Sequence, residues 1–322
     1  MLWESADPQA ALTERFDLAD FDHAVRWLTT ALADRWAIDV VGCERIVISG
    51  DNAIAWVGTG QGTLIAKWSR ARHQFPRLAA TADLIHRLHQ QGIPVPSTVN
   101  SIDGEHRVII DSGSQALSTT VQRWVDGDHL DTSASTTVLE AGACLAQLHH
   151  AMSNHADGRL MPKQGDLDLD LRQRIERWLD GEDPGATPQA SARLRAQIAG
   201  LPPLDAQPQL VHNDYRGSNI LIARSRVVAV LDFDEAGLNY CMYDLANAAV
   251  LLNTRFTNWQ PTARAAREAL VAGYRSVQPL TDSQQLWLEA LVLWRGITAV
   301  PPGDDPAGWA EAVASSGSDP RQ

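Results

Sequence analysis

The sequence predicts an α+β fold in two parts, with a small antiparallel sheet within residues 1–125 and a mostly helical region over residues 126–322. Three observations lead to this prediction. Short apolar runs alternate with glycine-rich turns in the first part. A helical pattern over residues 76–91 separates three of these runs from two more. After Gly127, apolar residues recur at steps of three and four, which is typical of helices.

The elements of the first part follow one another in a regular order. An amphipathic helix is expected over residues 20–36. Its apolar face comprises Phe21, Val25, Leu28 and Leu32. Five strands are then expected, over residues 45–49, 53–57, 63–68, 106–111 and 117–125. The glycines from Gly58 to Gly62 look like a nucleotide loop, but no helix follows them, so we interpret the run as the tip of a hairpin.

The second part is predicted to contain long helices joined by polar loops. One helix has a single buried stripe, formed by Val138, Ala141, Leu145, Leu148 and Met152. Further helices are expected over residues 262–275 and 282–298. Loops are expected over residues 155–170 and 181–190, and the Pro-, Gly- and Ser-rich tail from Pro301 is expected to be loosely held.

Composition excludes several classes of protein. A chain of 322 residues with 44% apolar residues suits one or two domains with a real core. A net charge of −12 argues against a nucleic-acid partner. No run of 18 apolar residues predicts a membrane span, and the N-terminus lacks the apolar core of a signal peptide. Cys43, Cys144 and Cys241 lack metal spacing and predict reduced thiols in a cytoplasmic protein.

The most informative segment is Leu210–Leu221, which reads LVHNDYRGSNIL. It holds His212, Asp214 and Asn219 in an H-x-D-x-x-x-x-N frame, and an apolar strand that ends at Asp232 follows it. Phosphoryl transfer from a metal-bound nucleotide needs such parts. One carboxylate orients or deprotonates the attacking hydroxyl, while an amide oxygen and a second carboxylate hold Mg²⁺.

The spacing of these residues predicts that they meet. Gly217 lets the chain turn tightly between Asp214 and Asn219. Two short strands then form a hairpin around the polar turn 224–226. Asn219 enters this hairpin and Asp232 leaves it, so antiparallel pairing places the two proposed metal ligands close together.

The following stretch, VVAVLDFDEAGLNYCMYDLA, completes a resemblance to a known group. Together the two segments resemble the aminoglycoside phosphotransferase and choline kinase family, which has the protein-kinase-like fold. The resemblance implies that Asp214 is the catalytic base or orienting group, and that Asn219 and Asp232 bind Mg²⁺. It also implies that Asp244 is a buried acid that braces the catalytic loop.

Residues of the first part are expected to bind the nucleotide. Ile65 and Lys67 share one face of a strand, so Ile65 can pack on the adenine while Lys67 reaches the α- and β-phosphates. The chain has one other lysine, Lys163. The resemblance implies an acid that holds Lys67, and the family has a Glu there. This chain has Asp83 at that place, and Asp is one methylene shorter than Glu. Asp83 therefore either pairs with Lys67 or faces water.

The resemblance places the remaining contacts of the nucleotide. The turn from Ser49 to Asn52 is expected to cover the phosphates, although an ordinary Asx turn fits it nearly as well. The resemblance implies that the hinge that bonds the adenine edge is formed by Arg123, Trp124 and Val125. Leu221 would form the floor beneath the adenine. The apolar residues of this set could equally be ordinary core residues. Arg216 either stabilises charge on the γ-phosphoryl group or is a surface arginine. His212 is expected to brace the loop.

These observations predict an ATP-dependent small-molecule kinase that uses Mg²⁺, with GTP as an alternative nucleotide. Only eleven residues separate Asp232 from Asp244, too few for the activation segment of a protein kinase. An inactive nucleotide-binding regulator is disfavoured because Lys67, Asp214 and Asn219 accompany Asp232. The oligomeric state stays open.

The acceptor is expected to be a small hydroxyl compound. Residues 126–322 contain 25 acids against 16 bases, which favours a cationic, amine-bearing acceptor such as an aminoglycoside-like compound. The acids gather in loops, at Asp166, Asp168 and Asp170, at Glu182 and Asp183, and at Asp234 and Glu235. A generic acidic surface explains the same charge. A metabolic kinase of the choline, homoserine or sugar type is the alternative function.

Overall fold

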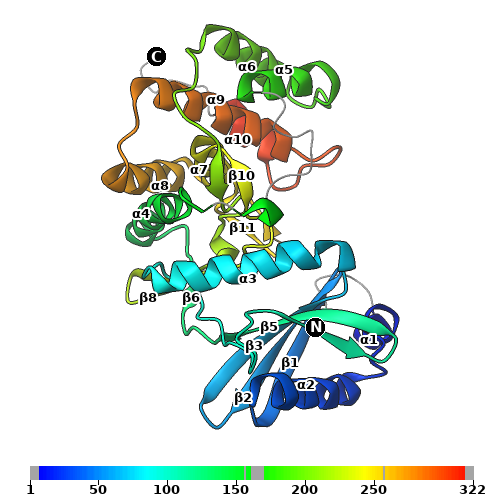
Figure 1. Cartoon of the computed structure of the whole chain (residues 1–322). Coiled ribbons are helices and arrows are strands. Elements are labelled where there is room, and N and C mark those ends of the chain that lie inside the picture. The colour runs from blue at the N-terminus through cyan, green and yellow to red at the C-terminus, as the bar shows by residue number, and fades with distance from the viewer. Residues whose placement is uncertain (1–6, 156, 161–169, 257, 316–322) are drawn as a thin grey trace. The chain divides into compact units, whose positions relative to one another are not determined.

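The computed structural model describes residues 7–155, 157–160, 170–256 and 258–315. The chain divides into two compact units, Met1–Asp126 and Gly127–Gln322. The first is built on a sheet and the second mostly on helices (Figure 1). This content confirms the predicted α+β fold, with an antiparallel sheet followed by a mostly helical part.

A five-stranded antiparallel sheet forms the first unit, in the order β1-β2-β3-β5-β4. Its strands are β1 (Val40–Ser49), β2 (Asn52–Thr59), β3 (Gly62–Ser69), β4 (Val108–Ser112) and β5 (Gln115–Arg123). All five predicted strands are therefore confirmed. Thr59 pairs with Gly62, which has a φ of 110° that side chains rarely adopt, so the glycine run is a hairpin tip as predicted.

Three helices accompany the sheet: α1 (Pro8–Phe16), α2 (Phe21–Trp36) and α3 (Phe75–Gln90). The last two confirm the predicted helices. We did not predict α1, although Asp7 is an N-cap residue whose carboxylate accepts the Gln9 N–H at 2.8 Å. Phe21 belongs to the predicted apolar face but is not buried. It is 42% exposed because it lies in the first turn, before Ala24, where α2 joins the core.

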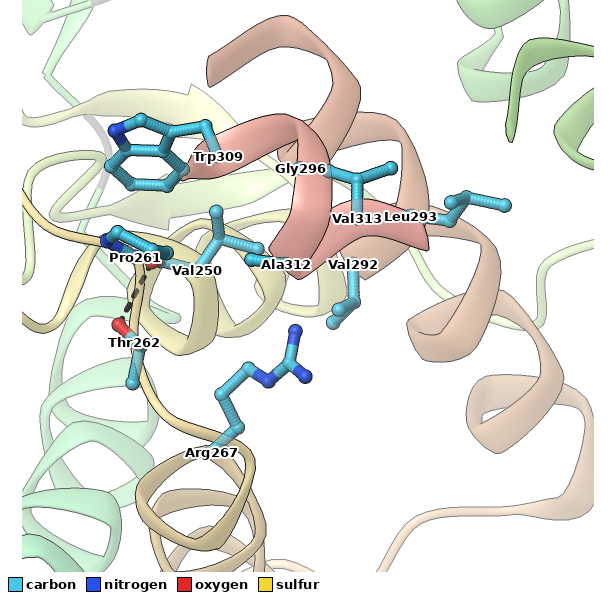
Figure 2. Close-up of a pocket in the computed structure, with 10 residues that line it drawn as sticks. All are labelled: Val250, Pro261, Thr262, Arg267, Val292, Leu293, Gly296, Trp309, Ala312 and Val313. Atoms are coloured by element: carbon cyan, nitrogen blue, oxygen red, sulfur yellow. Dashed lines mark hydrogen bonds between the residues drawn. The ribbon is translucent and has the colours of Figure 1, made fainter. Parts of the chain in front are cut away.

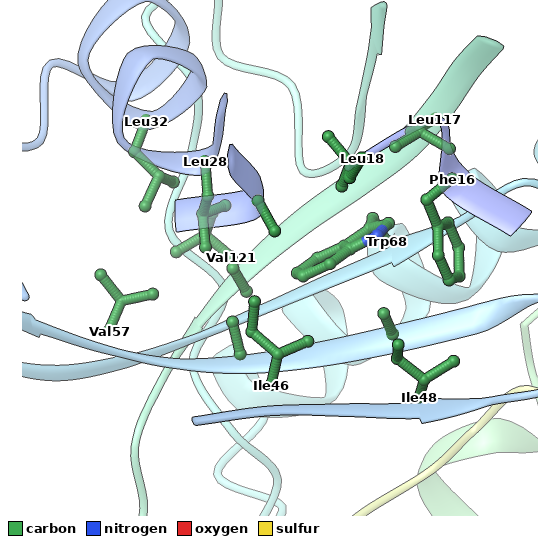
Figure 3. Packing of buried hydrophobic residues seen from close by; sticks show 14 of the residues in the cluster. Phe16, Leu18, Leu28, Leu32, Ile46, Ile48, Val57, Trp68, Leu117 and Val121 are labelled. Carbon is green, nitrogen blue, oxygen red and sulfur yellow. The ribbon is translucent and has the colours of Figure 1, made fainter. Parts of the chain in front are cut away.

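One face of the sheet packs against α1 and α2 to form the hydrophobic core of this unit (Figure 3). Trp68 of β3 lies within this core and is fully buried. The Phe16 and Trp27 rings meet its indole edge-on, at centroid distances of 6.2 and 5.5 Å. Burial of such large rings contributes to the stability of the unit.

The opposite face of the sheet carries the predicted nucleotide residues. Ala66 and Trp68 of β3 are buried in the core with α1 and α2. Side chains alternate along a strand, so Ile65 and Lys67 lie on the other face. Ile54 of β2 is the cross-strand neighbour of Lys67 on that face. The shared face predicted for Ile65 and Lys67 follows directly from this register.

Helices make up most of the second unit. They are α4 (Ser135–Met152), α5 (Leu171–Gly181), α6 (Pro188–Gly200), α7 (Cys241–Leu251), α8 (Arg264–Val277), α9 (Asp282–Ala299) and α10 (Trp309–Ser315). A small sheet comprises β6 (Asp128–His129), β8 (Ile220–Ala223) and β9 (Arg226–Val230). Two strand pairs complete the unit: β7 (Gln209–Val211) with β10 (Gly237–Asn239), and β11 (Thr254–Arg255) with β12 (Asn258–Trp259).

The three helices predicted for this unit are confirmed. All five residues of the predicted stripe on α4 are buried, and α8 and α9 occupy the two later segments. The loop expected over 181–190 is wrong for its last three residues, because Pro188 begins α6. The acids Asp166 and Asp168 lie outside the described residues, whereas Asp170 is the N-cap of α5.

The tail after Pro301 is not loosely held over its described part. It forms α10, whose Trp309 and Val313 are buried. These two side chains line a small pocket with a free volume of about 20 Å³, together with residues of α7, α8 and α9 (Figure 2). The Pro, Gly and Ser content of the tail concealed the two apolar residues that anchor it.

Helices α4 and α8 approach each other closely at two glycines. A Cβ at Gly142 would lie 1.9 Å from the Leu270 carbonyl oxygen, and a Cβ at Gly273 would lie 1.9 Å from the Leu139 carbonyl oxygen. Both obstacles are backbone atoms of the facing helix, which cannot rotate away as a side chain can. The helices must therefore separate to admit even a methyl group.

We expect Gly142→Ala and Gly273→Ala each to lower the free energy of unfolding by about 1–3 kcal/mol, the usual cost of overpacking a core. Urea denaturation followed by circular dichroism measures this change. Gly181→Ala is the control, because a Cβ there meets nothing within 4 Å. Equal stabilities of Gly142→Ala and Gly181→Ala would contradict the close crossing.

Candidate active site

The loop that follows β7 is held by one buried carboxylate. Asp244 of α7 is 0% exposed and accepts the backbone N–H groups of His212 at 3.1 Å and Asn213 at 2.9 Å. Asn213 has a φ of 62°, a left-handed conformation that Asn tolerates better than most residues. The role that the resemblance implied for Asp244, bracing this loop, is confirmed by these two bonds.

A second contact of Asp244 comes from α4. His149 Nε2 lies 2.9 Å from Asp244 Oδ2, and His149 Nδ1 lies 2.9 Å from the Tyr274 hydroxyl. Burial disfavours a charged imidazole here, but Cys241, Tyr274 and Asp244 surround the ring and together raise the pKa of His149 well above its usual value. We did not predict His149 as part of the site, because nothing in the sequence links α4 to α7.

His212 braces the loop from within, as predicted. Its Nδ1 accepts the Asp214 backbone N–H at 3.2 Å, so its Nε2 must carry the proton that is donated to the Leu231 carbonyl at 3.0 Å. The ring also packs on Phe233, with centroids 4.6 Å apart. These contacts tie the loop to the end of β9 and leave His212 no free nitrogen for proton transfer.

The carboxylate of Asp214 is held through one oxygen. Its Oδ2 accepts the Asn219 Nδ2–H at 2.8 Å and the Arg216 Nε–H at 3.1 Å. No bond to its Oδ1 occurs in the described part of the chain, and the side chain is 21% exposed. Burial raises the pKa of Asp214 above its usual value; the Arg216 charge opposes this shift, and the Asp232 charge adds to it.

The hairpin predicted to carry the metal ligands is confirmed. Ile220 pairs with Val230, and the Leu231 N–H donates to the Asn219 carbonyl at 2.7 Å. Both Asn219 Nδ2 hydrogens point at Asp214, to its carbonyl at 2.9 Å and to its carboxylate, so Asn219 Oδ1 stays available as an acceptor. The Asp232 carboxylate has no hydrogen-bond partner among the described residues. Two free oxygen donors fit Mg²⁺.

Gly217 is required for a reason other than the predicted tight turn. Its φ is not positive, but its N–H donates to the Leu252 carbonyl at 2.8 Å. A Cβ there would lie 2.6 Å from that oxygen. The close approach joins the loop to the segment between α7 and β11, which a side chain at residue 217 would push away.

We expect Asn219→Ala and Asp232→Ala both to weaken Mg²⁺-dependent nucleotide binding, because each removes one of the two free oxygen donors. Mg²⁺ titrations of nucleotide binding, followed by calorimetry, measure the change. Asp180→Ala, which removes an exposed acid of the same unit, is the control. If both site variants kept the metal dependence of the unchanged protein, the proposed ligands would be wrong.

In the first unit, Lys67 and Asp83 are not paired in this structure. The Asp83 carboxylate lies 2.8 Å from His106 Nδ1, and its side chain is 42% exposed. The Lys67 ammonium has no hydrogen bond or ion pair among the described residues. His106 in turn stacks on His86 at a centroid distance of 4.0 Å. The pairing of Asp83 with Lys67 stays a prediction for a nucleotide-bound state.

We expect Lys67→Ala and Asp83→Ala each to raise KM for ATP, since paired residues are needed to hold the phosphates in kinase-like sites. The double variant should lose less than the two separate losses combined. Steady-state kinetics with all three variants test this. Asp103→Ala, another exposed acid of this unit, is the control. Fully additive losses would show that the two residues act independently.

The hinge segment has one backbone donor available. The Arg123 N–H donates to the Ser97 carbonyl at 2.9 Å, and the Trp124 N–H donates to the Thr63 carbonyl at 3.1 Å. The Val125 N–H has no backbone partner in the described ranges. Of the three residues predicted to bond the adenine edge, Val125 is thus the one whose N–H is free to donate.

The predicted phosphate turn is a tight connection between β1 and β2. Gly50 has a φ of 53°, and Asn52 is the first residue of β2, paired with Ser69 of β3. The Asp51 carboxylate accepts the Arg70 Nε–H at 2.7 Å. The turn is therefore held from β3, the strand that carries Lys67. In the second unit, Leu221 is buried in β8, opposite Ala229.

An antiparallel sheet unit, followed by a mostly helical unit with a braced loop and the β8–β9 hairpin, is the architecture of the protein-kinase-like small-molecule kinases. Residues 43–280 match the phosphotransferase enzyme family, and the chain belongs to that family. The resemblance to aminoglycoside phosphotransferases and related kinases is confirmed by this match.

Curated relatives include homoserine kinases. That of Pseudomonas aeruginosa (strain LESB58) is 29% identical over 209 residues, which cover 62% of this chain and 60% of the relative. That of Gluconobacter oxydans (strain 621H) is 26% identical over 266 residues, 78% of each chain. The match with the Pseudomonas protein thus spans less than two thirds of its length.

Solved structures share the fold at low sequence identity. A microcompartment-associated aminopropanol kinase is 23% identical, with a TM-score of 0.60 over 90% of this chain and 93% of the other. An amicoumacin kinase, solved with AMP-PNP and Ca²⁺, is 17% identical, with a TM-score of 0.60 over 90% and 91%. A macrolide 2′-phosphotransferase from Brachybacterium faecium is 18% identical, with the same score over 92% and 99%. In the described residues, no helix is long and apolar enough to cross a membrane.

Proposed function

We propose that this protein transfers the γ-phosphoryl group of ATP to a hydroxyl group of a small, amine-bearing molecule. The observation that carries the proposal is the Asp214 carboxylate, fixed through Oδ2 by Asn219 and Arg216, with Oδ1 left open. Asp214 Oδ1 accepts the acceptor hydroxyl and takes its proton. The hydroxyl oxygen bonds to the γ-phosphorus, the bond from phosphorus to the β–γ bridging oxygen breaks, and ADP leaves.

The other side chains of the proposed site handle charge. Arg216 uses only Nε toward Asp214, so its two Nη groups can stabilise the γ-phosphoryl oxygens. Asn219 Oδ1 and Asp232 would hold Mg²⁺, which would neutralise negative charge on the phosphates. In the first unit, we assign Lys67 to the α- and β-phosphates and Ile65 to the adenine. The three cysteines are free, which fits a reduced, cytoplasmic setting where ATP is available.

Two observations support an amine-bearing acceptor. Residues 126–322 have an excess of acids, 25 against 16 bases, and such a surface concentrates cations. The relatives and structural neighbours of the chain include enzymes named for homoserine and aminopropanol, which both contain an amine and a hydroxyl. A homoserine kinase is the second candidate, favoured by the 29% identity to the Pseudomonas enzyme.

Turnover of matched acceptor pairs with labelled ATP tests the proposal. Aminopropanol is compared with propanediol, in which a hydroxyl replaces the amine, and homoserine is compared with hydroxybutyrate, which lacks the amine. An aminoglycoside, choline and a neutral sugar complete the panel. We expect the amines to be preferred and their KM to rise with salt, because salt screens charge attraction. Preference for propanediol or the sugar, without a salt effect, would overturn the amine assignment. Selective turnover of homoserine would establish the second candidate.

A further inference from the structure

The guanidinium of Arg216 is contacted on two sides. Its Nε donates to Asp214 Oδ2 at 3.1 Å, and its Cζ lies 5.7 Å from the centroid of the Trp259 ring. Contacts to its Nη groups are absent among the residues the structure describes. A planar group that is bonded at one edge and supported on one face has little freedom to rotate. Its free edge is therefore held in a single direction.

Trp259 is itself tied to the catalytic loop. It belongs to the β11–β12 hairpin, where its Nε1–H donates to the Phe256 carbonyl at 2.9 Å. Its own carbonyl accepts the Trp309 Nε1–H at 3.2 Å. The hairpin begins just after Leu252, whose carbonyl accepts the Gly217 N–H at 2.8 Å. The indole is thus positioned by backbone bonds that do not involve Arg216.

The exposure of Trp259 sets it apart from a core residue. Its side chain is 51% exposed, although tryptophan is one of the most costly residues to leave in water. The exposed indole lies against the guanidinium next to the proposed catalytic carboxylate. A cation near an aromatic face within about 6 Å is attracted to it.

We propose that Trp259 is a positioning residue for phosphoryl transfer, whose ring holds the Arg216 guanidinium beside Asp214 with both Nη groups directed at the transferred phosphoryl group. The inference rests on the proposed function, which gives Arg216 its target. It assigns to the β11–β12 hairpin a part in the chemical step. Trp259 acts through Arg216 and does not itself contact the reacting atoms.

Replacing Trp259 with Ala should lower kcat about 2- to 30-fold, the range expected when one cation–π contact is lost. KM for ATP should change little, because the proposal gives the ring a contact with Arg216 and none with the nucleotide. Trp259→Phe should keep most of kcat, since a smaller aromatic face remains, whereas Trp259→Leu should behave like Trp259→Ala. The Arg216→Gln background provides the decisive comparison: there, Trp259→Ala should cause no further loss.

The matched control is Phe256→Ala on the same hairpin. Phe256 is 44% exposed, and its ring meets His129 edge-on at 5.3 Å, whereas the ring beside the Arg216 guanidinium is that of Trp259. Its variant should retain the kcat of the unchanged protein. Because both aromatic side chains are about half exposed, their loss should leave the melting temperature nearly unchanged, which separates positioning from folding.

Three results would overturn the inference. In the first, the kcat losses of Trp259→Ala and Arg216→Gln multiply in the double variant. In the second, Trp259→Leu has the same kcat as Trp259→Phe. In the third, Trp259→Ala changes only KM for the acceptor. Failure of the proposed function is distinguishable, because the unchanged protein would then phosphorylate no acceptor. In that case the ¹⁵N order parameter of the Arg216 Nε–H still tests the contact. It should fall in Trp259→Ala, and an unchanged value would show that the ring does not restrain the arginine.

Discussion

Asp214→Asn is expected to lower kcat about 10²- to 10⁴-fold, the usual contribution of a positioned acid–base group. The Asn oxygen can still accept the Asn219 and Arg216 donors that converge on Oδ2, so the loop should keep its conformation. The amide NH₂ then replaces Oδ1 and cannot accept a proton from the hydroxyl. Nucleotide affinity should be nearly unchanged. Turnover and nucleotide titration, measured on the same preparation, separate the two effects.

Asp180→Asn is the control for this variant. It makes the same chemical change at an exposed acid of α5 that pairs only with Arg195 in the described chain, so it should retain full activity. Near-normal turnover of Asp214→Asn would refute the assignment of the base. A parallel loss of nucleotide binding would instead show that Asp214 contributes to the metal site.

Asp244→Ala should be strongly destabilising, lowering the free energy of unfolding by about 3–5 kcal/mol. The substitution leaves the N–H groups of His212 and Asn213 without an acceptor and leaves His149 buried beside no carboxylate. Unpaired buried polar groups are expensive because water cannot reach them. Urea denaturation measures the loss, and turnover should fall as well, since the loop loses its brace.

Glu268→Ala is the matched control. Glu268 pairs with Arg264 one helical turn away, and both side chains are more than half exposed, so the change should stay within about 0.5 kcal/mol. Asp244→Asn should lie between the two variants, because its amide retains one acceptor oxygen. Equal stabilities of Asp244→Ala and Glu268→Ala would mean that the network around Asp244 does not hold the loop.

The sequence predicted those features that depend on neighbouring residues. The hairpin from Ile220 to Val230 follows from two short apolar runs around a polar turn, and its register brings Asn219 to Leu231. The shared face of Ile65 and Lys67 follows from the alternation of strand side chains. The stripe on α4 follows from helical periodicity. In each case the geometry is set within about twenty residues of chain.

Long-range contacts were harder to foresee. His149 meets Asp244 across 95 positions of sequence, and no local pattern announces that pair. Asp83 was expected to meet either Lys67 or water, and it meets His106 from the start of the β4 region instead. Helix α10 was not predicted, because the tail is rich in Pro, Gly and Ser. Burial of its two apolar side chains, Trp309 and Val313, nevertheless holds it against the unit.

The sequence by itself therefore determined the fold class and the spacing of Asp214, Asn219 and Asp232, since both depend on local pattern and chain order. Tertiary structure alone decided which atoms of these residues are left free. Asn219 Oδ1 is free because both Nδ2 hydrogens of Asn219 are donated to Asp214. Asp214 Oδ1 is free because Asn219 and Arg216 both donate to Oδ2. Hydrogen bonds have direction as well as partners, and only packing in three dimensions sets that direction.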